Sequence, residues 1–236
     1  MKIISWNCNG AFRKKYSLLD SFNADVLIIQ ECENPAESKD TNYVKWASNF
    51  LWIGDSKNKG LGVFVKDYYL LEKLDWSNLY TNHAVKYFLP FSIDKKHTFL
   101  GVWTHKNNSP NFGYIGQLWK YLQINIHNID NSIIVGDFNS NKIWDQWDRW
   151  WNHSDVVEIL ASKGLQSIYH LKFIENQGEE KLPTFYLQRN KKKSYHIDYC
   201  FASKLYLDKL IDFSVGDFSE WSEFSDHNPI CIEISD

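Results

Sequence analysis

The chain has 236 residues, a net charge of −3 and 17% aromatic residues. A chain of this length can bury roughly 70–75% of its unfolded surface, which excludes a miniprotein that depends on disulfides or a structural metal. The mildly acidic balance excludes a protein that coats nucleic acid with a uniformly basic surface, but it leaves room for a local basic patch. We therefore expect one globular domain over residues 1–236, monomeric by default, in which any metal ion serves chemistry.

Short runs rich in β-branched and aromatic residues predict strands along the whole chain. In chain order they cover residues 2–6, 25–30, 62–65, 85–93, 98–104, 132–135, 194–202 and 230–234. Apolar residues spaced three and four apart predict helices over residues 111–128 and 154–163, and Gly164 is typical of the left-handed position that ends a helix. Strands that alternate with helices, together with hairpin-like pairs, indicate a mixed α/β domain.

Polar residues recur at the carboxyl ends of these strands, where open α/β sheets bind ligands. Carboxylate, amide and imidazole groups at such ends predict one polar cleft that offers oxygen ligands to a hard divalent cation and holds a candidate base. The residues concerned are Asn7, Asn9, Glu31, His105, Asp137, Asn139, Asp198, Asp226 and His227.

The motifs around these residues resemble, in the same order, those of the endonuclease/exonuclease/phosphatase superfamily, which includes exonuclease III and deoxyribonuclease I. They are Ser5-Trp6-Asn7-Cys8-Asn9-Gly10, Ile29-Gln30-Glu31, Gly62-Val63-Phe64-Val65, Gly136-Asp137-Phe138-Asn139-Ser140, His196-Ile197-Asp198-Tyr199 and Ser225-Asp226-His227-Asn228-Pro229-Ile230. The resemblance spans nearly the whole chain. It implies a four-layer α/β/β/α sandwich, in which two packed mixed sheets are flanked by helices and the active site lies at one edge.

The resemblance also implies a metal-binding side of the site. Glu31 would be the principal ligand of Mg²⁺ or Mn²⁺, and Asp226 would be the second carboxylate. Asn7 and Asn9 would help to bind the metal, the phosphate or the catalytic carboxylates. The alternative for each asparagine is an Asx-turn at the end of a strand.

The same resemblance implies hydrolytic roles for four further residues. Asp137 would orient or deprotonate the attacking water, and Asn139 would hold the phosphate or Asp137 itself. His227 would contact the scissile phosphate, either as a base or as a phosphate clamp. Asp198 would fix the tautomer of His227 and raise its pKa.

His105 departs from the pattern of the exonuclease III type of AP endonuclease, which usually has a tyrosine followed by Pro-Asn in this stretch. A histidine here is more similar to deoxyribonuclease I and the sphingomyelinases, where it contacts the phosphate or protonates the leaving oxygen. Ser194-Tyr195-His196 likewise stands where many AP endonucleases have Gly-Trp-Arg. Both departures argue against an abasic-site enzyme.

Two basic runs are expected to flank the cleft and bind phosphates, although such runs are also typical of solvated turns. Only three of the 26 basic residues are arginines, so bidentate recognition of bases is not the expected mode. The candidate phosphate-binding residues are Arg13, Lys14, Arg189 and Lys191.

Trp144, Trp147 and Trp151 have helical spacing, and such aromatic stripes usually pack into the core. The alternative hypothesis makes Trp144 and Trp147 a stacking platform for a base or sugar beside the cleft.

The four cysteines show no zinc or redox spacing. We expect reduced, buried thiols, which are typical of a cytoplasmic protein. The chain has no run of 18 apolar residues, so the sequence predicts no membrane anchor.

The sequence thus predicts a Mg²⁺- or Mn²⁺-dependent phosphodiesterase, specifically an endo- or exonuclease acting on DNA or RNA. One alternative is a phosphatase or phosphodiesterase for a small molecule, nucleotide or lipid headgroup. The other is a catalytically silent binding module built on the same fold.

Overall fold

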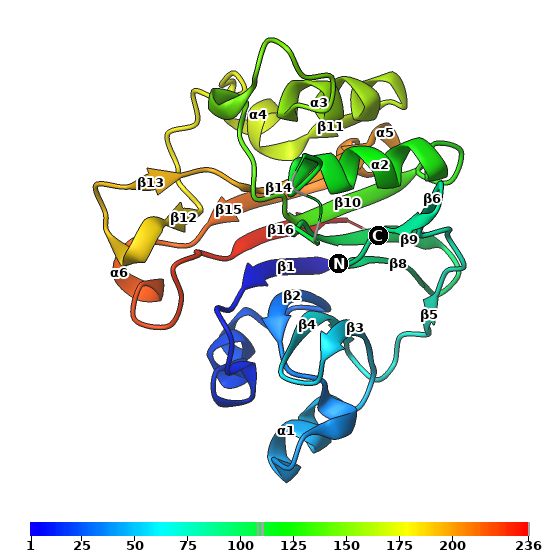
Figure 1. The fold of residues 1–236 in the computed structure, drawn as a ribbon. Coiled ribbons are helices and arrows are strands. Elements are labelled where there is room, and N and C mark those ends of the chain that lie inside the picture. The colour runs from blue at the N-terminus through cyan, green and yellow to red at the C-terminus, as the bar shows by residue number, and fades with distance from the viewer. Residues whose placement is uncertain (108, 110, 236) are drawn as a thin grey trace.

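The computed structural model describes residues 1–107, 109 and 111–235, and it contains two six-stranded mixed sheets (Figure 1). The strand order in the first sheet is β15-β16-β1-β2-β4-β3. Its strands are β1 (Lys2–Asn7), β2 (Val26–Cys32), β3 (Phe50–Ser56), β4 (Lys59–Val65), β15 (Leu210–Val215) and β16 (Ile230–Ile234).

The strand order in the second sheet is β11-β14-β10-β9-β8-β5. Its strands are β5 (Leu71–Lys73), β8 (Phe88–Ile93), β9 (His97–Trp103), β10 (Ser132–Asp137), β11 (Leu165–Ser167) and β14 (Asp198–Ser203). Two short hairpins lie outside these sheets: β6 (Leu79–Tyr80) with β7 (His83–Ala84), and β12 (Phe185–Tyr186) with β13 (Ser194–Tyr195).

Each sheet has a parallel pair among its central strands, β1 with β2 and β9 with β10, and the other neighbours are antiparallel. Parallel strands end at the same edge of a sheet, and β10 faces β1 and β2 across the sandwich. The strand ends that carry Asn7, Glu31 and Asp137 therefore meet. This topology, rather than proximity in the sequence, assembles the candidate site.

An apolar layer fills the space between the sheets, because alternate strand residues point inward. It includes Ile28 and Val63 from the first sheet and Phe99 and Val135 from the second, all fully buried. Helices cover both outer faces, as Figure 1 shows. The helices of the described residues are α1 (Thr41–Trp46), α2 (Ile115–Asn125), α3 (His153–Ser162), α4 (Ile168–Phe173), α5 (Lys204–Leu207), α6 (Phe218–Trp221) and the 3-10 helices η1 (Phe12–Lys14), η2 (Tyr16–Phe22), η3 (Pro35–Glu37), η4 (Lys142–Trp144) and η5 (Leu187–Arg189).

The outer layers differ between the two faces. Leu118 and Leu160, from α2 and α3, pack on Leu100 and Ile134 of the second sheet. Phe12, Leu19 and Tyr43, from η1, η2 and α1, pack on the first sheet. The predicted four-layer α/β/β/α sandwich is confirmed.

Several predicted boundaries need correction. The strand expected over residues 194–202 is interrupted at residues 196–197, which separate β13 from β14. The strand expected to begin at Val85 begins at Phe88, after Tyr87 at φ +65°. The helix expected over residues 111–128 begins only at Ile115, after Tyr114 at φ +53°. A left-handed residue breaks the regular backbone in both of the latter cases.

The helical stripe predicted for Trp144 to Trp151 is wrong, because turns follow η4 in this stretch. Asn152 accepts a hydrogen bond from the backbone N–H of Gln146 at 2.9 Å, and Asp145 accepts one from the N–H of His153 at 2.9 Å. Such side-chain bonds compete with helical ones. Gly164 does occupy the expected left-handed position, at φ +74°.

The predicted burial of the cysteines is confirmed for three of the four. All four thiols are free, with Cys8, Cys32 and Cys200 buried and Cys231 partly buried. Among the described residues, no helix is both long enough and apolar enough to cross a membrane.

Gly136 fixes the position of β10 directly before Asp137. It has φ +148°, and a Cβ atom there would lie 1.9 Å from the carbonyl oxygen of Val102 on β9. We expect Gly136→Ala to destabilise the protein by roughly 1–3 kcal/mol, because the strands must separate or the backbone must change. Urea unfolding measures this loss. Gly164→Ala is the control, because it also changes a left-handed glycine but meets no atom within 4 Å; equal losses would show that the contact with Val102 is irrelevant.

Candidate active site

Three buried side chains form the centre of the candidate site. Asp137, at the end of β10, faces Asp198, at the start of β14, in the antiparallel register. The Nδ1 atom of His227 lies 2.9 Å from Oδ2 of Asp198. Each of the three residues offers a potential ligand atom within 4.8 Å of the other two. The fold thus brings together Asp137, Asp198 and His227, as the sequence predicts.

Two asparagines hold the carboxylate of Asp137. Nδ2 of Asn7 donates to Oδ2 of Asp137 at 2.9 Å, and Nδ2 of Asn139 donates to the same oxygen at 2.8 Å. The backbone N–H of Asn139 donates to Oδ1 at 2.8 Å. With three donors on two oxygens, the carboxylate has one defined orientation. Asn7 comes from the first sheet, so this contact also joins the two sheets at the site.

His227 is fixed by residues to which the sequence assigned no separate role. Nε1 of Trp6 donates to the carbonyl oxygen of His227 at 2.9 Å, and the N–H of His227 donates to Oγ of Ser225 at 3.0 Å. The Ser225 hydroxyl in turn donates to the carbonyl oxygen of Asn7 at 2.7 Å. Trp6 and Ser225 both lie inside the recognised motifs, but nothing in the sequence shows that they connect the two ends of the chain.

The buried charges shift one another's protonation. Burial and the nearby charge of Asp198 raise the pKa of Asp137 to about 7. Burial alone would lower the pKa of His227, but the charges of Asp198 and Asp137 raise it to about 9. The imidazolium is therefore favoured at neutral pH, and Asp137 titrates near neutrality.

The donor set at this edge fits a hard divalent cation. Two carboxylates lie buried beside one imidazole, and Oδ1 of Asp198 is buried without a hydrogen-bond partner among the described residues. Glu31 and Asp226 add two partly exposed carboxylates from the neighbouring segments. Carboxylate and amide oxygens of this kind are the ligands that Mg²⁺ and Mn²⁺ prefer.

A β-bulge places Glu31 at the end of β2. The register between β2 and β4 shifts between Gln30 and Cys32, so Glu31 is the extra residue, and it has φ +64°. Bulges commonly redirect a side chain in this way. Asn7 pairs with Gln30 in the parallel register, which brings the end of β1 beside Glu31. The carboxylate of Glu31 forms an ion pair with Lys59, with Oε2 2.8 Å from Nζ.

Asn9, Asp226 and His105 lie on segments that adjoin this centre, next to or two residues from Asn7, His227 and Thr104, respectively, and the N–H of Thr104 donates to the carbonyl oxygen of Asp137. Asn9 is exposed, and its N–H donates to Oδ1 of Asn7 at 3.1 Å. The carbonyl oxygen of Asp226 accepts a hydrogen bond from Tyr186 N–H at 2.7 Å. His105 is exposed, and its ring lies 5.5 Å from the rings of both Tyr87 and Trp103.

The predicted phosphate-binding residues have different environments. Arg13 forms an ion pair with the buried Glu33. Lys14 and Lys191 are exposed, with Nζ of Lys191 5.8 Å from the ring of Phe218, and Arg189 donates to the carbonyl oxygen of Glu223 at 3.0 Å. Positive charge therefore remains at the surface at Lys14, Arg189 and Lys191, whereas the guanidinium of Arg13 is paired with Glu33.

Lys15 has a structural role that sequence reasoning missed. Its Nζ donates to the carbonyl oxygens of Cys8 and Phe224, both at 2.7 Å. It thus joins the segment after β1 to the segment before Asp226. Burial lowers the pKa of Lys15, and neighbouring Arg189 lowers it further. A lysine within a basic run gives no sequence signal for such a bridge.

Aromatic rings form a series from His227 toward the surface. Ring centroids are 4.7 Å apart for His227 and Phe185, 6.4 Å for Phe185 and Tyr195, and 5.1 Å for Tyr195 and Trp144. Trp144 is 40% exposed, and Trp147 is 97% exposed. In Figure 1, β1 runs toward the side on which the β12–β13 hairpin lies, so these rings stand at the active-site edge.

A buried polar network supports the loop after Asp137. Nδ2 of Asn141 donates to Oε2 of Glu180 at 3.0 Å and to the carbonyl oxygen of His196 at 2.9 Å. Nε2 of His170 lies 3.1 Å from Oε1 of Glu180, and Nε2 of His153 lies 3.0 Å from Oε1 of Gln177. The bond from Asn141 to His196 connects the loop after Asp137 to the segment before Asp198.

His153 makes stability depend on pH. Burial lowers its pKa to about 4, against roughly 6.5 in the unfolded chain, so folding excludes a proton between these values. The free energy of unfolding therefore keeps the full contribution of neutral His153 above about pH 6.5, and it falls by about 1.4 kcal/mol per pH unit below that value. Between about pH 7.5 and pH 5.5, we expect wild type to lose about 1 kcal/mol more stability than His153→Gln in urea unfolding. Identical losses would contradict this role.

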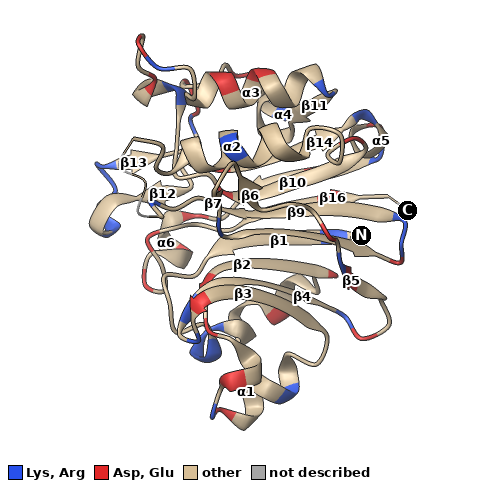
Figure 2. Cartoon of the chain, turned by 45° about the vertical axis from the view of Figure 1, so that its right-hand side comes forward, with Lys and Arg blue, Asp and Glu red and all other residues tan. Residues whose placement is uncertain are grey.

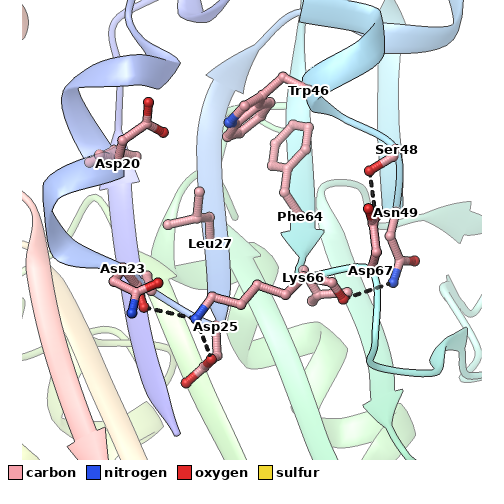
Figure 3. A pocket seen from close by; sticks show the side chains of 13 residues that line it. Asp20, Asn23, Asp25, Leu27, Trp46, Ser48, Asn49, Phe64, Lys66 and Asp67 are labelled. Carbon is pink, nitrogen blue, oxygen red and sulfur yellow. Dashed lines mark hydrogen bonds and ion pairs between the residues drawn. The ribbon is translucent and has the colours of Figure 1, made fainter.

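The cavity in Figure 3 lies away from the candidate site. It has a volume of about 310 Å³, and Leu27, Trp46 and Phe64 form part of its wall. Lys66 closes one side by bonding to Asp25 at 2.9 Å. Asp25 precedes β2, whereas Glu31 stands near its other end, six residues or roughly 20 Å away. The candidate active site therefore lies at the opposite end of the sheet.

The chain also matches known proteins in sequence and structure. A family model described as the Endonuclease/Exonuclease/phosphatase family matches residues 4–227. No curated protein sequence matches the chain at a significant level.

Solved structures share the fold at low sequence identity. The 3′ phosphatase NExo from Neisseria, solved with a product DNA hairpin, has a TM-score of 0.72 and 17% identity, with 100% of this chain and 99% of that chain covered. An AP endonuclease from Archaeoglobus fulgidus has a TM-score of 0.71 and 16% identity, with both chains fully covered. The endonuclease domain of the telomere-specific retrotransposon TRAS1 has a TM-score of 0.64 and 19% identity, with 99% and 97% covered.

The family match extends from β1 to His227 and so includes every strand end that forms the site. The chain belongs to the Endonuclease/Exonuclease/phosphatase family.

Proposed function

We propose that this chain is a Mg²⁺- or Mn²⁺-dependent phosphodiesterase that acts as a nuclease on DNA or RNA. The observation that carries the proposal is the buried group of Asp137, Asp198 and His227, with Asn7 and Asn139 holding the Asp137 carboxylate. A structural role alone does not explain two adjacent buried carboxylates, because burying two like charges side by side is costly. Family membership supports the hydrolytic chemistry.

Each group has a place in the reaction. Glu31 and Asp226, with Asn9 nearby, hold the cation, which supplies Lewis-acid stabilisation of the phosphate when bound. Asp137 accepts a proton from the attacking water, and Asn7 and Asn139 keep its carboxylate in one orientation.

His227 and His105 act on the phosphate in this proposal. His227, charged and held at Nδ1 by Asp198, offers its imidazolium to the scissile phosphate. His105 lies exposed at the same edge, where it can contact the phosphate or protonate the leaving oxygen.

Charge at the surface supports a polyanionic substrate. Figure 2 shows basic residues on the β12–β13 hairpin, which adjoins His227 through Phe185. Lys14, Arg189 and Lys191 would bind phosphates of the nucleic acid backbone, and such contacts weaken as salt rises. The solved complex of NExo with a DNA hairpin is consistent with this choice.

The proposal also covers domain organisation, assembly and compartment. We infer a single catalytic domain over residues 1–236 that acts as a monomer. Four free thiols support a reducing, cytoplasmic compartment.

A substrate panel tests the function. The purified chain is assayed with Mg²⁺, Mn²⁺ or a chelator against single-stranded, duplex and abasic DNA, RNA, nucleotides, inositol phosphates and sphingomyelin. We expect metal-dependent cleavage of a polynucleotide that the chelator abolishes. Hydrolysis of only the small phosphates would overturn the nuclease proposal, and no hydrolysis with any metal would overturn the enzyme proposal.

Trp147 tests the aromatic part of the substrate site. Its ring is almost fully exposed, three residues after Trp144 in the chain, so an unpaired base can stack on it. We expect Trp147→Ala to weaken binding of a labelled single-stranded oligonucleotide roughly fivefold to a hundredfold, measured by fluorescence anisotropy. Trp150→Ala is the matched control, because Trp150 is 65% exposed but lies toward Phe112. Equal effects of both variants would contradict a specific stacking role.

A further inference from the structure

Lys59 forms an ion pair with Glu31, and neither the motifs nor the proposed mechanism gives this lysine a role. Its Nζ lies 2.8 Å from Oε2 of Glu31, at the position where a cation would meet this carboxylate. The same Nζ lies 5.8 Å from the ring centroid of Trp103, which pairs with Asp137 in the register of β9 and β10. The ammonium therefore stands between the metal-binding side and the hydrolytic side of the site.

The backbone fixes the point from which the Lys59 side chain extends. Lys59 is the first residue of β4, directly before Gly60, which pairs with Cys32 across the bulge that exposes Glu31. Gly60 is packed so closely that a Cβ atom would lie 2.3 Å from the carbonyl oxygen of Ile53. The stem of Lys59 thus leaves a rigid strand end and points to Glu31.

The ion pair is easily exchanged. The side chain of Lys59 is 52% exposed and that of Glu31 is 17% exposed, and solvent-exposed ion pairs contribute little to stability. A lysine ammonium is a compact charge on a flexible stem, so it can move to another anion without a change of backbone. A divalent cation on Glu31 would repel it.

We propose that Lys59 and the divalent cation are alternative partners of Glu31, and that cation binding releases Lys59 to bind the substrate phosphate. This inference rests on the proposed metal-dependent phosphoesterase function. It gives Lys59 two opposite effects: it competes with the metal in the free protein, and it attracts the phosphate once the metal is bound. A merely structural ion pair would produce neither effect.

Mn²⁺ binding without substrate tests the first effect. Electron paramagnetic resonance of free Mn²⁺ gives its dissociation constant for wild type, Lys59→Met and Lys59→Arg. We expect Lys59→Met to bind Mn²⁺ about two- to tenfold more tightly, because the competing charge is gone. Lys59→Arg should bind no more tightly than wild type, since a guanidinium can grip the carboxylate with two hydrogen bonds.

Inorganic phosphate at saturating Mg²⁺ tests the second effect. We expect the thermal shift that phosphate produces in wild type to diminish in Lys59→Met and to persist in Lys59→Arg. Lys66→Met is the matched control, because Lys66 forms a 2.9 Å pair with Asp25, which precedes β2 at the strand end opposite Glu31. It should leave the Mn²⁺ affinity unchanged.

The outcomes separate this inference from the proposed function. If wild type binds Mn²⁺ and Lys59→Met binds it equally or more weakly, the exchange is wrong while the enzyme proposal stands. If Lys59→Met binds Mn²⁺ more tightly but keeps its full phosphate response, the release to the phosphate is wrong. If wild type binds no Mn²⁺ at all, this inference fails, and the substrate panel with Mg²⁺ decides the enzyme proposal.

Discussion

Asp137→Asn is expected to lose about a hundredfold to ten-thousandfold of the metal-dependent hydrolysis and to remain folded. An amide cannot accept the proton of the attacking water. Nor can it accept all three hydrogen bonds that the carboxylate receives from Asn7 and Asn139, because one of its two polar atoms is a donor.

The fold should survive because the buried, charged carboxylate of Asp137 destabilises the folded protein. Burial and Asp198 raise its pKa to about 7, so above that pH the folded protein carries a carboxylate that would be more stable in water. The stabilising contribution of a carboxyl with a raised pKa is lost as the pH rises through the folded value. The neutral amide removes this cost, which offsets the mismatched hydrogen bonds.

The measurement is kcat with Mg²⁺ on the best substrate of the panel, together with urea unfolding at about pH 8. Asp145→Asn is the matched control, because Asp145 lies in the loop that follows and only accepts hydrogen bonds from the backbone N–H groups of His153 and Ser154. It should keep its activity. Full activity of Asp137→Asn would show that another group activates the water.

The sequence is informative about the site because strand ends and topology are coupled. In the register that β14 adopts on β10, Asp137 and Asp198 face each other, although they are 61 residues apart in the chain. Polar residues after apolar runs therefore identify the edge, and the family resemblance supplies the order. Periodicity predicts only the mixed α/β class, and the resemblance implies the four-layer sandwich that the structure confirms.

The remaining features depend on side-chain pairs that no spacing encodes. Arg13 bonds to Glu33, and Lys15 bridges two backbone carbonyls, although both belong to one basic run. The tryptophan segment has helical spacing, yet the caps at Asp145 and Asn152 impose turns. Such local competition is decided by individual hydrogen bonds, which leave little trace in periodicity.

The second large effect is expected at His227. His227→Gln should lose about a hundredfold or more of kcat, because a neutral amide replaces a buried imidazolium directed at the phosphate. Glutamine is preferred to alanine here, since the side chain is buried and truncation would leave a cavity.

Asp198 should contribute to catalysis by orienting His227 and raising its pKa, and not by contacting the substrate itself. Its Oδ2 holds Nδ1 of His227 at 2.9 Å, and its charge contributes to the raised pKa of about 9. Asp198→Asn alone should therefore cost about tenfold to a hundredfold, and it should add almost nothing to His227→Gln.

A double-mutant cycle on kcat measures this coupling, with unfolding curves to confirm that all three variants are folded. Residues that act as one unit give strongly non-additive losses, because removing the imidazole also removes what the carboxylate orients. If the two losses instead multiply, Asp198 contacts the substrate or the metal by itself. Its buried Oδ1, which has no hydrogen-bond partner among the described residues, would then be the atom that makes the contact.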